Sequence, residues 1–273
     1  MSPPCQPFTR QGLQKDTEDS RTQPFLHIMK ELIPNMTSLK YVLLENVKGF
    51  EVSNAHATLL QVLKASGFKT QEYLICPKQL GIPNSRLRYY LIASKANSFQ
   101  PKDVLVSDPW TAGINEDLLQ EFHKPNLKLS DYFDDSVANK SLKVDDKILE
   151  KHAEVLDIVQ GDSTGSCCFT KAYGKYAKGT GSVIQQSGNL EEVFEKVRKA
   201  EKSSERLEIL EALSLRYFSP TEVANLLGFP KAFTFPPKVA ENPRNCFRLL
   251  GNSLNVSVVA LLTSVLLQDY SSP

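Results

Sequence analysis

The sequence lacks the marks of membrane-spanning and secreted proteins. No apolar run approaches the roughly 18 residues of a transmembrane helix, and the first residues show no basic segment followed by an apolar one, as a secretory signal would. The 5 cysteines are odd in number and scattered over 273 residues. These absences predict no membrane span, and free thiols in a reducing compartment.

Glycine is also sparse, with 13 residues in the chain. The nearest approach to a nucleotide-binding glycine motif is Gly179-Thr180-Gly181. It lacks both a preceding buried strand and a third glycine at the required spacing, so we interpret it as a turn. Internal repeats and low-complexity tracts are absent too.

What is present is an ordinary globular composition. Hydrophobic residues make up 41% of the chain and aromatic residues 9%, which is enough for a core and excludes global disorder. The length predicts two domains, or one domain with a large insertion. Residues 1–95 carry 12 basic and 7 acidic side chains. This excess fits a phosphate-bearing partner or an ordinary solvated surface, and charge alone leaves both open.

Apolar periodicity predicts an α/β domain in the first third of the chain. The pattern indicates a helix, a strand, a helix, a strand, a turn-rich loop and a strand, at 20–33, 41–44, 54–65, 68–75, 77–84 and 88–93. The continuous apolar run at 41–44 is typical of a strand buried on both faces, as in a parallel sheet. Alternating helices and strands favour the α/β class.

Composition changes after residue 94, where a long polar stretch begins and ends in a charged, helix-like segment at 190–213. Order returns near residue 215. Ser219 and Glu222 form a capping-box pattern at the start of a helix, and a long apolar helix is expected at 254–268. We therefore predict a first part of the main domain at 1–95, an insertion at 96–214 and a closing part at 215–273.

Two positions near the start are candidates for chemistry. Cys5 lies between prolines, which present its thiol on a stiff loop; the alternative is an inert, packed cysteine. Glu45 ends a buried apolar strand, where a carboxylate is costly unless it has a partner; the alternative is a helix-capping glutamate.

Two later segments also carry candidate functional residues. Arg86 and Arg88 alternate, so an extended chain points both guanidiniums to one side, where they suit an anion or a base carbonyl. An exposed edge is the alternative. Gly251-Asn252-Ser253 opens the last helix, and helix capping alone would explain it.

The order of these motifs along the chain is a more specific indicator of a protein family than any single motif. Pro-Pro-Cys-Gln, Glu-Asn-Val, Arg-x-Arg, Leu-Gly-Phe-Pro and Gly-Asn-Ser stand at 3–6, 45–47, 86–88, 227–230 and 251–253. This order resembles the cytosine-5 methyltransferase family through nearly the whole chain. Finer features resemble the Dnmt2-type subfamily, which methylates a cytosine in the anticodon loop of aspartate tRNA. These features are Cys168-Phe169-Thr170 and the stretches 2–10, 43–51, 81–89 and 225–230.

The resemblance implies an α/β fold: a Rossmann-like S-adenosylmethionine-dependent methyltransferase domain with a smaller inserted target recognition domain. It also implies catalytic roles. The Cys5 thiol attacks carbon 6 of cytosine 38, and Glu45 contacts ring nitrogen 3 and the exocyclic amine. Arg86 and Arg88 orient the base and the catalytic loop. S-adenosylmethionine supplies the methyl group, and the target base must be unstacked to react.

Further residues follow from the same resemblance. Pro4, Asn252, Ser253 and Val256 are the candidate cofactor-binding residues. Arg10, Lys48, Lys171 and Tyr173 are the candidate substrate-binding residues. Near the last two, Lys175, Lys178 and Tyr176 add further phosphate-contacting and base-stacking candidates. No metal is expected.

The sequence departs from the family pattern at its start. In the family, a strand and a glycine-rich loop that holds the cofactor precede Pro-Pro-Cys, and both are missing here. We therefore expect an N-terminally truncated form that does not methylate alone. A non-catalytic tRNA-binding isoform and a DNA cytosine-5 methyltransferase are the alternatives. A monomer is expected, in the cytoplasm, with the nucleus as a further compartment.

Overall fold

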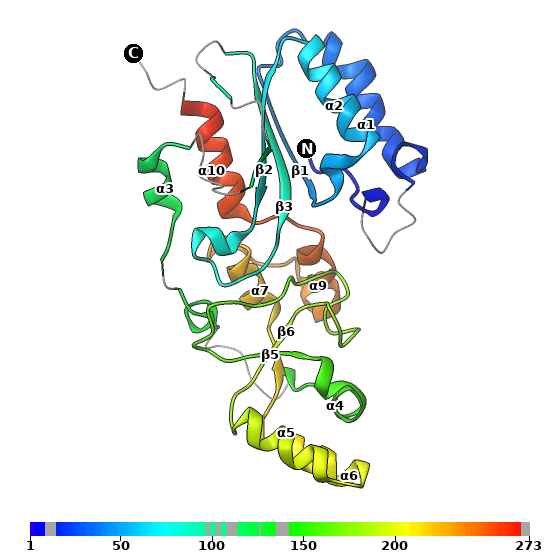
Figure 1. The fold of residues 1–273 in the computed structure, drawn as a ribbon, viewed down its shortest axis with the longest axis vertical. Coiled ribbons are helices and arrows are strands. Elements are labelled where there is room, and N and C mark those ends of the chain that lie inside the picture. Colours follow the sequence, from blue (N-terminus) through cyan, green and yellow to red (C-terminus); the bar gives the residue numbers. More distant parts are fainter. Residues whose placement is uncertain are drawn as a thin grey trace. The chain divides into compact units, whose positions relative to one another are not determined.

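The computed structural model describes residues 1–8, 15–96, 99–101, 105–107, 114–125, 127–134 and 142–268. The chain, drawn as a ribbon in Figure 1, forms two compact units. Unit 1 comprises Met1–Leu80, Leu87–His123 and Ser257–Pro273, and unit 2 comprises Gly81–Arg86 and Lys124–Val256.

Unit 1 is built on a four-stranded sheet in the order β1-β3-β2-β4. Its strands are β1 (Tyr41–Val47), β2 (Lys69–Ile75), β3 (Arg88–Ser94) and β4 (Leu105–Val106). β3 pairs antiparallel with both β1 and β2, and β2 pairs parallel with β4. The predicted strands are confirmed, but the parallel pairing expected of the first is not, because its ladder partner β3 runs antiparallel.

Helices cover both faces of this sheet. α1 (Gln23–His27) and α2 (Asn54–Ala65) lie on one side, and α10 (Val256–Leu267) lies on the other (Figure 1). The Ser53 hydroxyl caps α2 by accepting from the His56 N–H, and Gly67 follows its end with φ +80°. The helix predicted at 20–33 is a series of short segments, in which a π-helical turn, Ile28–Leu32, follows α1. Unit 1 also contains the short helix α3 (Glu116–Phe122).

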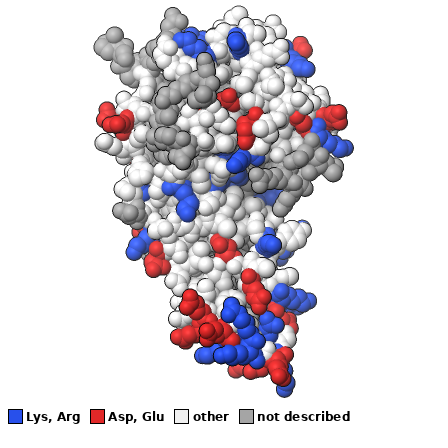
Figure 2. Space-filling view, viewed as in Figure 1, with Lys and Arg blue, Asp and Glu red and all other residues white. Residues whose placement is uncertain are grey.

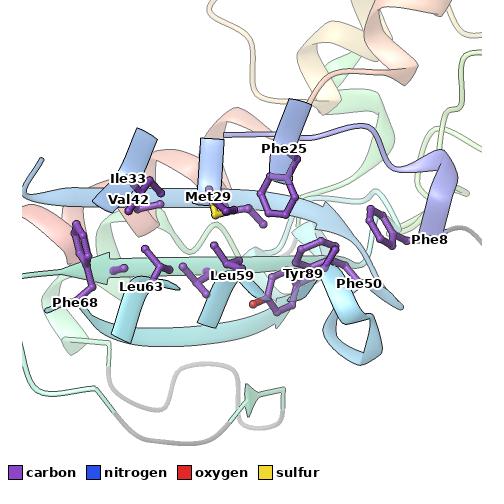
Figure 3. Close-up of a cluster of buried hydrophobic side chains, with 14 residues drawn as sticks. Phe8, Phe25, Met29, Ile33, Val42, Phe50, Leu59, Leu63, Phe68 and Tyr89 are labelled. Carbon is purple, nitrogen blue, oxygen red and sulfur yellow. The ribbon is translucent and has the colours of Figure 1, made fainter. Parts of the chain in front are cut away.

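The core of unit 1 lies between the sheet and α1–α2. It buries mainly aliphatic side chains with a few aromatic rings, including Phe8, Phe25, Met29, Ile33, Val42, Phe50, Leu59, Leu63, Phe68 and Tyr89 (Figure 3). Phe8 comes from the Cys5 loop, and its ring meets that of Phe50 edge to face at 5.0 Å. The loop that carries Cys5 is therefore anchored in the core.

The described residues of unit 2 form a small sheet, β5-β6-β7, and six α-helices. The strands are β5 (Asp157–Val159), β6 (Ser182–Ile184) and β7 (Arg216–Tyr217). The helices are α4 (Asp146–His152), α5 (Leu190–Lys199), α6 (Ser203–Glu211), α7 (Pro220–Leu226), α8 (Pro237–Ala240) and α9 (Pro243–Gly251). Figure 2 shows acidic and basic side chains interspersed over α5 and α6.

Of the predictions for this part of the chain, some are confirmed and others are not. The capping box of Ser219 and Glu222 is confirmed at α7, whereas the helix predicted at 190–213 is two helices. The compact units do not follow the segment bounds expected from composition, because Leu215, Phe218 and Phe247 pack in the cores of unit 2.

The stretch Pro243–Leu267 is long and apolar enough to cross a membrane by length and composition alone. This is weak evidence, since core helices pass the same test. It consists of α9 and α10, and the side chains of Leu261 and Leu262 on α10 are fully buried.

Candidate active site

The loop that carries Cys5 is docked along the end of β1. The Met1 amino group donates to Leu43 O at 2.5 Å, and the Glu45 N–H donates to Met1 O at 2.9 Å. The Asn46 carboxamide donates to Pro3 O at 3.4 Å. The thiol of Cys5 is partly exposed and free of any disulfide. The two motifs Pro-Pro-Cys and Glu-Asn-Val thus form one site in unit 1.

Glu45 is the buried carboxylate of this site, with 7% of the residue exposed. Its Oε2 accepts from the Ser2 hydroxyl at 2.5 Å, and its Oε1 lies 3.5 Å from Arg88 Nε. A buried carboxylate needs such partners to remain stable. The alternative that Glu45 caps a helix is wrong, because the residue lies within β1.

Phe8 and Gly49 fix the far side of the loop. A Cβ at Gly49 would lie 3.3 Å from Phe8 O, and the residue has φ +109°. Glycine adopts this backbone conformation without strain. Close approach of the two backbones therefore holds Cys5 at the carboxyl end of β1. Lys48, a predicted substrate-binding residue, is exposed beside Gly49.

Arg21 supplies positive charge near Cys5, and the sequence motifs did not point to it. Its guanidinium donates to Asp19 through Nε at 2.8 Å and through Nη2 at 2.6 Å. The pKa of Arg21 is raised above its ordinary value, chiefly by the hydrogen bond to Asp19 and in smaller part by the charge of Cys5. Arg21 and Cys5 thus lie close enough to interact electrostatically.

The described contacts of Arg86 lie within unit 2. Arg86 belongs to unit 2, is 3% exposed, and donates to Phe169 O and Gly251 O, each at 3.4 Å, and to Ser253 O. The expectation that both guanidiniums point to one side to hold a base stays a prediction. Arg86 is occupied with backbone carbonyls, which makes it a positioning residue.

Asn84, two residues before Arg86, also forms hydrogen bonds within unit 2, and it was not singled out from the sequence. Its carboxamide donates to Ser166 Oγ at 3.1 Å and to Cys167 O at 3.0 Å. The Asn-x-Arg spacing of residues 84–86 was the available signal. Together the two side chains hold the segment that leads into Cys168-Phe169-Thr170.

Tyr173 lies in the core of unit 2 and not on its surface. It is 2% exposed, and its ring meets those of Phe169 and Phe247 at 4.9 Å each. Its hydroxyl donates to Ser182 O at 2.5 Å and accepts from the Phe218 N–H at 2.9 Å. These contacts leave no ring face for a base, which corrects the expected stacking role.

The surface of the same loop is basic. Lys171, Lys175 and Lys178 are exposed, and Tyr176 is 58% exposed. The Lys175 ammonium lies 5.2 Å from the centre of the Tyr176 ring. Exposed lysines beside an aromatic ring suit a nucleic-acid strand, since they offer phosphate contacts and a stacking face.

The predicted cofactor-binding residues lie in two places. Asn252 and Ser253 form the turn after α9, and Val256 begins α10. Asn252 is exposed, whereas the Ser253 hydroxyl donates to Leu250 O at 2.8 Å and so caps α9 rather than α10. Pro4 is exposed on the Cys5 loop, and Arg10 lies outside the described residues. In the described part of the chain no cluster of ligating side chains suits a metal ion.

Asn255 completes the Gly-Asn-Ser turn and was not singled out from the sequence. It is fully buried, and its carboxamide donates to Leu226 O at 3.3 Å. The Val256 N–H donates to Leu227 O at 2.8 Å. The turn is therefore fixed against the end of α7, which the Leu-Gly-Phe-Pro motif follows directly.

Comparison with known proteins agrees with these observations. The family model for C-5 cytosine-specific DNA methylase matches residues 1–268. A tRNA (cytosine(38)-C(5))-methyltransferase from Homo sapiens is 40% identical over 97% of this chain and 81% of its own length. A crystal structure of a Spodoptera frugiperda DNMT2 mutant has a TM-score of 0.82 at 37% identity, covering 97% of this chain and 78% of its own. The crystal structure of Schizosaccharomyces pombe Dnmt2 methyltransferase has a TM-score of 0.79 at 35% identity, and the match covers 100% of this chain and 78% of that one.

Proposed function

Because the chain belongs to the C-5 cytosine-specific DNA methylase family, we propose that it is a tRNA methyltransferase acting on carbon 5 of cytosine 38 in the anticodon loop of aspartate tRNA. The docking of the Cys5 loop onto Glu45 and Asn46 carries this proposal, since it holds a nucleophile beside a partnered carboxylate. Relatives named for cytosine 38 of tRNA support RNA as the substrate.

The reaction begins at Cys5. Its thiolate forms a bond to carbon 6 of the cytosine, and the electrons of the carbon 5–carbon 6 double bond make carbon 5 nucleophilic. Glu45 stabilises the charge on the ring through nitrogen 3 and the exocyclic amine, and Arg88 positions the Glu45 carboxylate. After methylation, a base removes the carbon 5 proton and the thiol leaves.

The cofactor contacts proposed here are those of the turn after α9 and of the Cys5 loop. The exposed amide of Asn252 fits hydrogen bonding to a polar cofactor group, and Ser253 offers its hydroxyl oxygen as an acceptor. Val256 and Pro4 add apolar contacts. S-adenosylmethionine, the methyl donor that the family generally uses, would supply an electrophilic methyl group there.

The RNA contacts belong to the basic loop of unit 2. Lys171, Lys175 and Lys178 approach phosphates, and Tyr176 takes the stacking role that the sequence assigned to Tyr173. Lys48 and Arg10 complete the proposed substrate-binding residues. The protein acts as a monomer in the cytoplasm and the nucleus.

A mechanism-based trap tests this proposal without methyl transfer. In an anticodon stem-loop with 5-azacytosine at position 38, nitrogen replaces carbon 5 and makes carbon 6 more electrophilic. The thiol adds at carbon 6 while the ring nitrogen takes up a solvent proton, and rapid denaturation captures this adduct before it reverses. We expect the chain to form this adduct, seen as a shifted band on a denaturing gel, and Cys5→Ala not to form it. A DNA hairpin of the same sequence should react far more slowly. Equal reaction with DNA, or an adduct in the Cys5→Ala variant, would contradict the proposal.

A further inference from the structure

Two motifs of unit 2 that lie far apart in the chain meet backbone to backbone. A Cβ at Gly251 would lie 2.0 Å from Lys171 N and 2.3 Å from Thr170 C. These distances are far below van der Waals contact, and the neighbouring atoms are backbone atoms that cannot swing aside. Only glycine at position 251 allows the end of α9 to rest on the Thr170–Lys171 peptide.

Arg86 ties the same two segments together. One guanidinium nitrogen donates to Phe169 O at 3.4 Å, and the other donates to Gly251 O at 3.4 Å and to Ser253 O. The planar guanidinium presents several N–H donors in fixed directions, so a single side chain can satisfy carbonyls from two segments. Its burial, at 3% exposed, shields these bonds from water.

The exposed basic loop begins at this junction. Lys171 follows the peptide that touches Gly251, and Lys175, Tyr176 and Lys178 stand on the turns that come next. The Thr170 N–H donates to Thr180 O at 2.9 Å, which closes the loop at its base. The position of the loop therefore depends on contacts made at its first two residues.

We propose that Gly251 and Arg86 are positioning residues for RNA binding: they hold the basic loop at the Gly-Asn-Ser turn. This inference rests on the proposed function. It assigns to that turn, whose other residues are candidates for the cofactor, a second role in setting the RNA-binding surface. A substitution at Gly251 or Arg86 weakens RNA binding without changing any RNA-contacting side chain. The free energy of RNA binding is coupled to the contact that holds the basic loop on the turn.

Gly251→Ala tests the proposal, with Gly188→Ala as the matched control. Gly188 also meets a backbone atom, since a Cβ there would lie 2.8 Å from Ala212 O, and it likewise lies in unit 2 but away from the basic loop. Dissociation constants for a fluorescent aspartate-tRNA anticodon stem-loop are measured by anisotropy at a temperature where circular dichroism shows both variants folded. We expect Gly251→Ala to bind about fivefold more weakly or worse, and Gly188→Ala to bind like the wild type.

Hydrogen exchange gives a readout that does not depend on RNA. Amide exchange at 168–173 should accelerate in Gly251→Ala and not in Gly188→Ala. If Gly251→Ala does not fold, Arg86→Lys replaces it and the same losses are expected, because the single ammonium nitrogen cannot occupy the two separate positions from which the guanidinium nitrogens donate to the two segments. Unchanged affinity in the junction variant, or equal losses in the control, overturns the proposal. If the wild type binds no RNA hairpin, the proposed function fails with it, whereas the exchange pattern still shows whether the junction holds the loop.

Discussion

At the scale of single residues, the site of unit 1 depends on a nucleophile held beside a carboxylate. Met1 and Pro3, which precede Cys5, are hydrogen-bonded to β1, and Glu45 is placed by Ser2 and Arg88. The division of roles follows from chemistry: the thiol forms the bond, and the carboxyl group stabilises the charge that the bond formation creates. Both roles can be tested one side chain at a time.

Glu45→Gln should slow adduct formation with the 5-azacytosine stem-loop about 100-fold or more. The amide cannot carry the proton or the charge of the carboxyl group, and it loses the ion pair with Arg88. The rate is measured by quenched time points on denaturing gels. Glu31→Gln, which makes the same charge change at an exposed position of unit 1, is the control. A Glu45→Gln rate equal to the wild type would remove Glu45 from the mechanism.

Arg21→Gln should slow alkylation of Cys5 by iodoacetamide severalfold at neutral pH, because it removes a positive charge that interacts with the reacting cysteine. Mass spectrometry of the Cys5 peptide gives the rate at that residue alone. Lys30→Gln removes an exposed positive charge elsewhere in unit 1 and should leave the rate unchanged. Equal rates in the Arg21→Gln variant and the wild type would show that this charge does not act on the thiol.

At the scale of elements, α7 is fixed by a buried ion pair. Glu222 is fully buried, and its two oxygens accept from Arg216 at 2.8 and 2.9 Å. The same carboxylate accepts from the Ser219 N–H at 2.7 Å and closes the capping box. One side chain thus joins α7 to β7.

Glu222→Gln should lower the free energy of unfolding of unit 2 by about 3 kcal/mol or more, because it leaves the Arg216 charge buried without a counter-charge. Urea unfolding followed by circular dichroism measures the loss. Glu211→Gln breaks the exposed pair with Lys143 and should cost at most about 1 kcal/mol. Similar losses for the two variants would contradict this account of α7.

A second element-scale contact links α2 to the sheet of unit 1. Glu72 on β2 accepts from Tyr89 at 2.6 Å, and its Oε2 lies 2.5 Å from His56 Nε2. Burial by itself would raise the pKa of Glu72, but the hydrogen bonds from His56 and Tyr89 outweigh it and hold the pKa below its ordinary value. The ionised carboxylate is therefore the form that the fold stabilises.

A lowered pKa in the folded state means that this stabilisation is complete above the unfolded pKa of about 4.3 and is lost as the pH falls through the folded value. The free energy of unfolding of unit 1 should thus decline below about pH 4.3, and it should decline less in Glu72→Gln. Urea titrations at a series of pH values between neutral and acid compare the two. Parallel curves for the variant and the wild type would rule out this contribution.

At the scale of the whole molecule, the sequence predicted what depends on neighbours in the chain. The capping box of Ser219 and Glu222, the limits of α2 and the three main strands of unit 1 follow from local spacing. The motif order was also sufficient to identify the family. Each of these features is encoded within a few residues of where it appears.

Contacts between distant segments could not be predicted in this way. The burial of Tyr173 depends on Phe169 and Phe247, and the role of Arg86 depends on a turn 165 residues further along. The alternation at 86–88 did not indicate that Arg86 donates to backbone carbonyls of unit 2, whereas Arg88 lies beside Glu45 of unit 1. Tertiary packing decides whether a polar or aromatic side chain faces solvent, and spacing alone does not contain that information.

Exchange of the hydrogen at carbon 5 of cytosine 38 tests the central claim most directly. Addition of Cys5 to carbon 6 allows carbon 5 to take a solvent proton and to lose its original hydrogen when the adduct reverses. A tRNA with tritium at carbon 5 of cytosine 38 should therefore release tritium to water in the presence of the chain, and Cys5→Ala should abolish the release. Release that persists in Cys5→Ala, or no release above background by the folded wild-type chain that binds the tRNA, would contradict the assignment of Cys5 as the nucleophile.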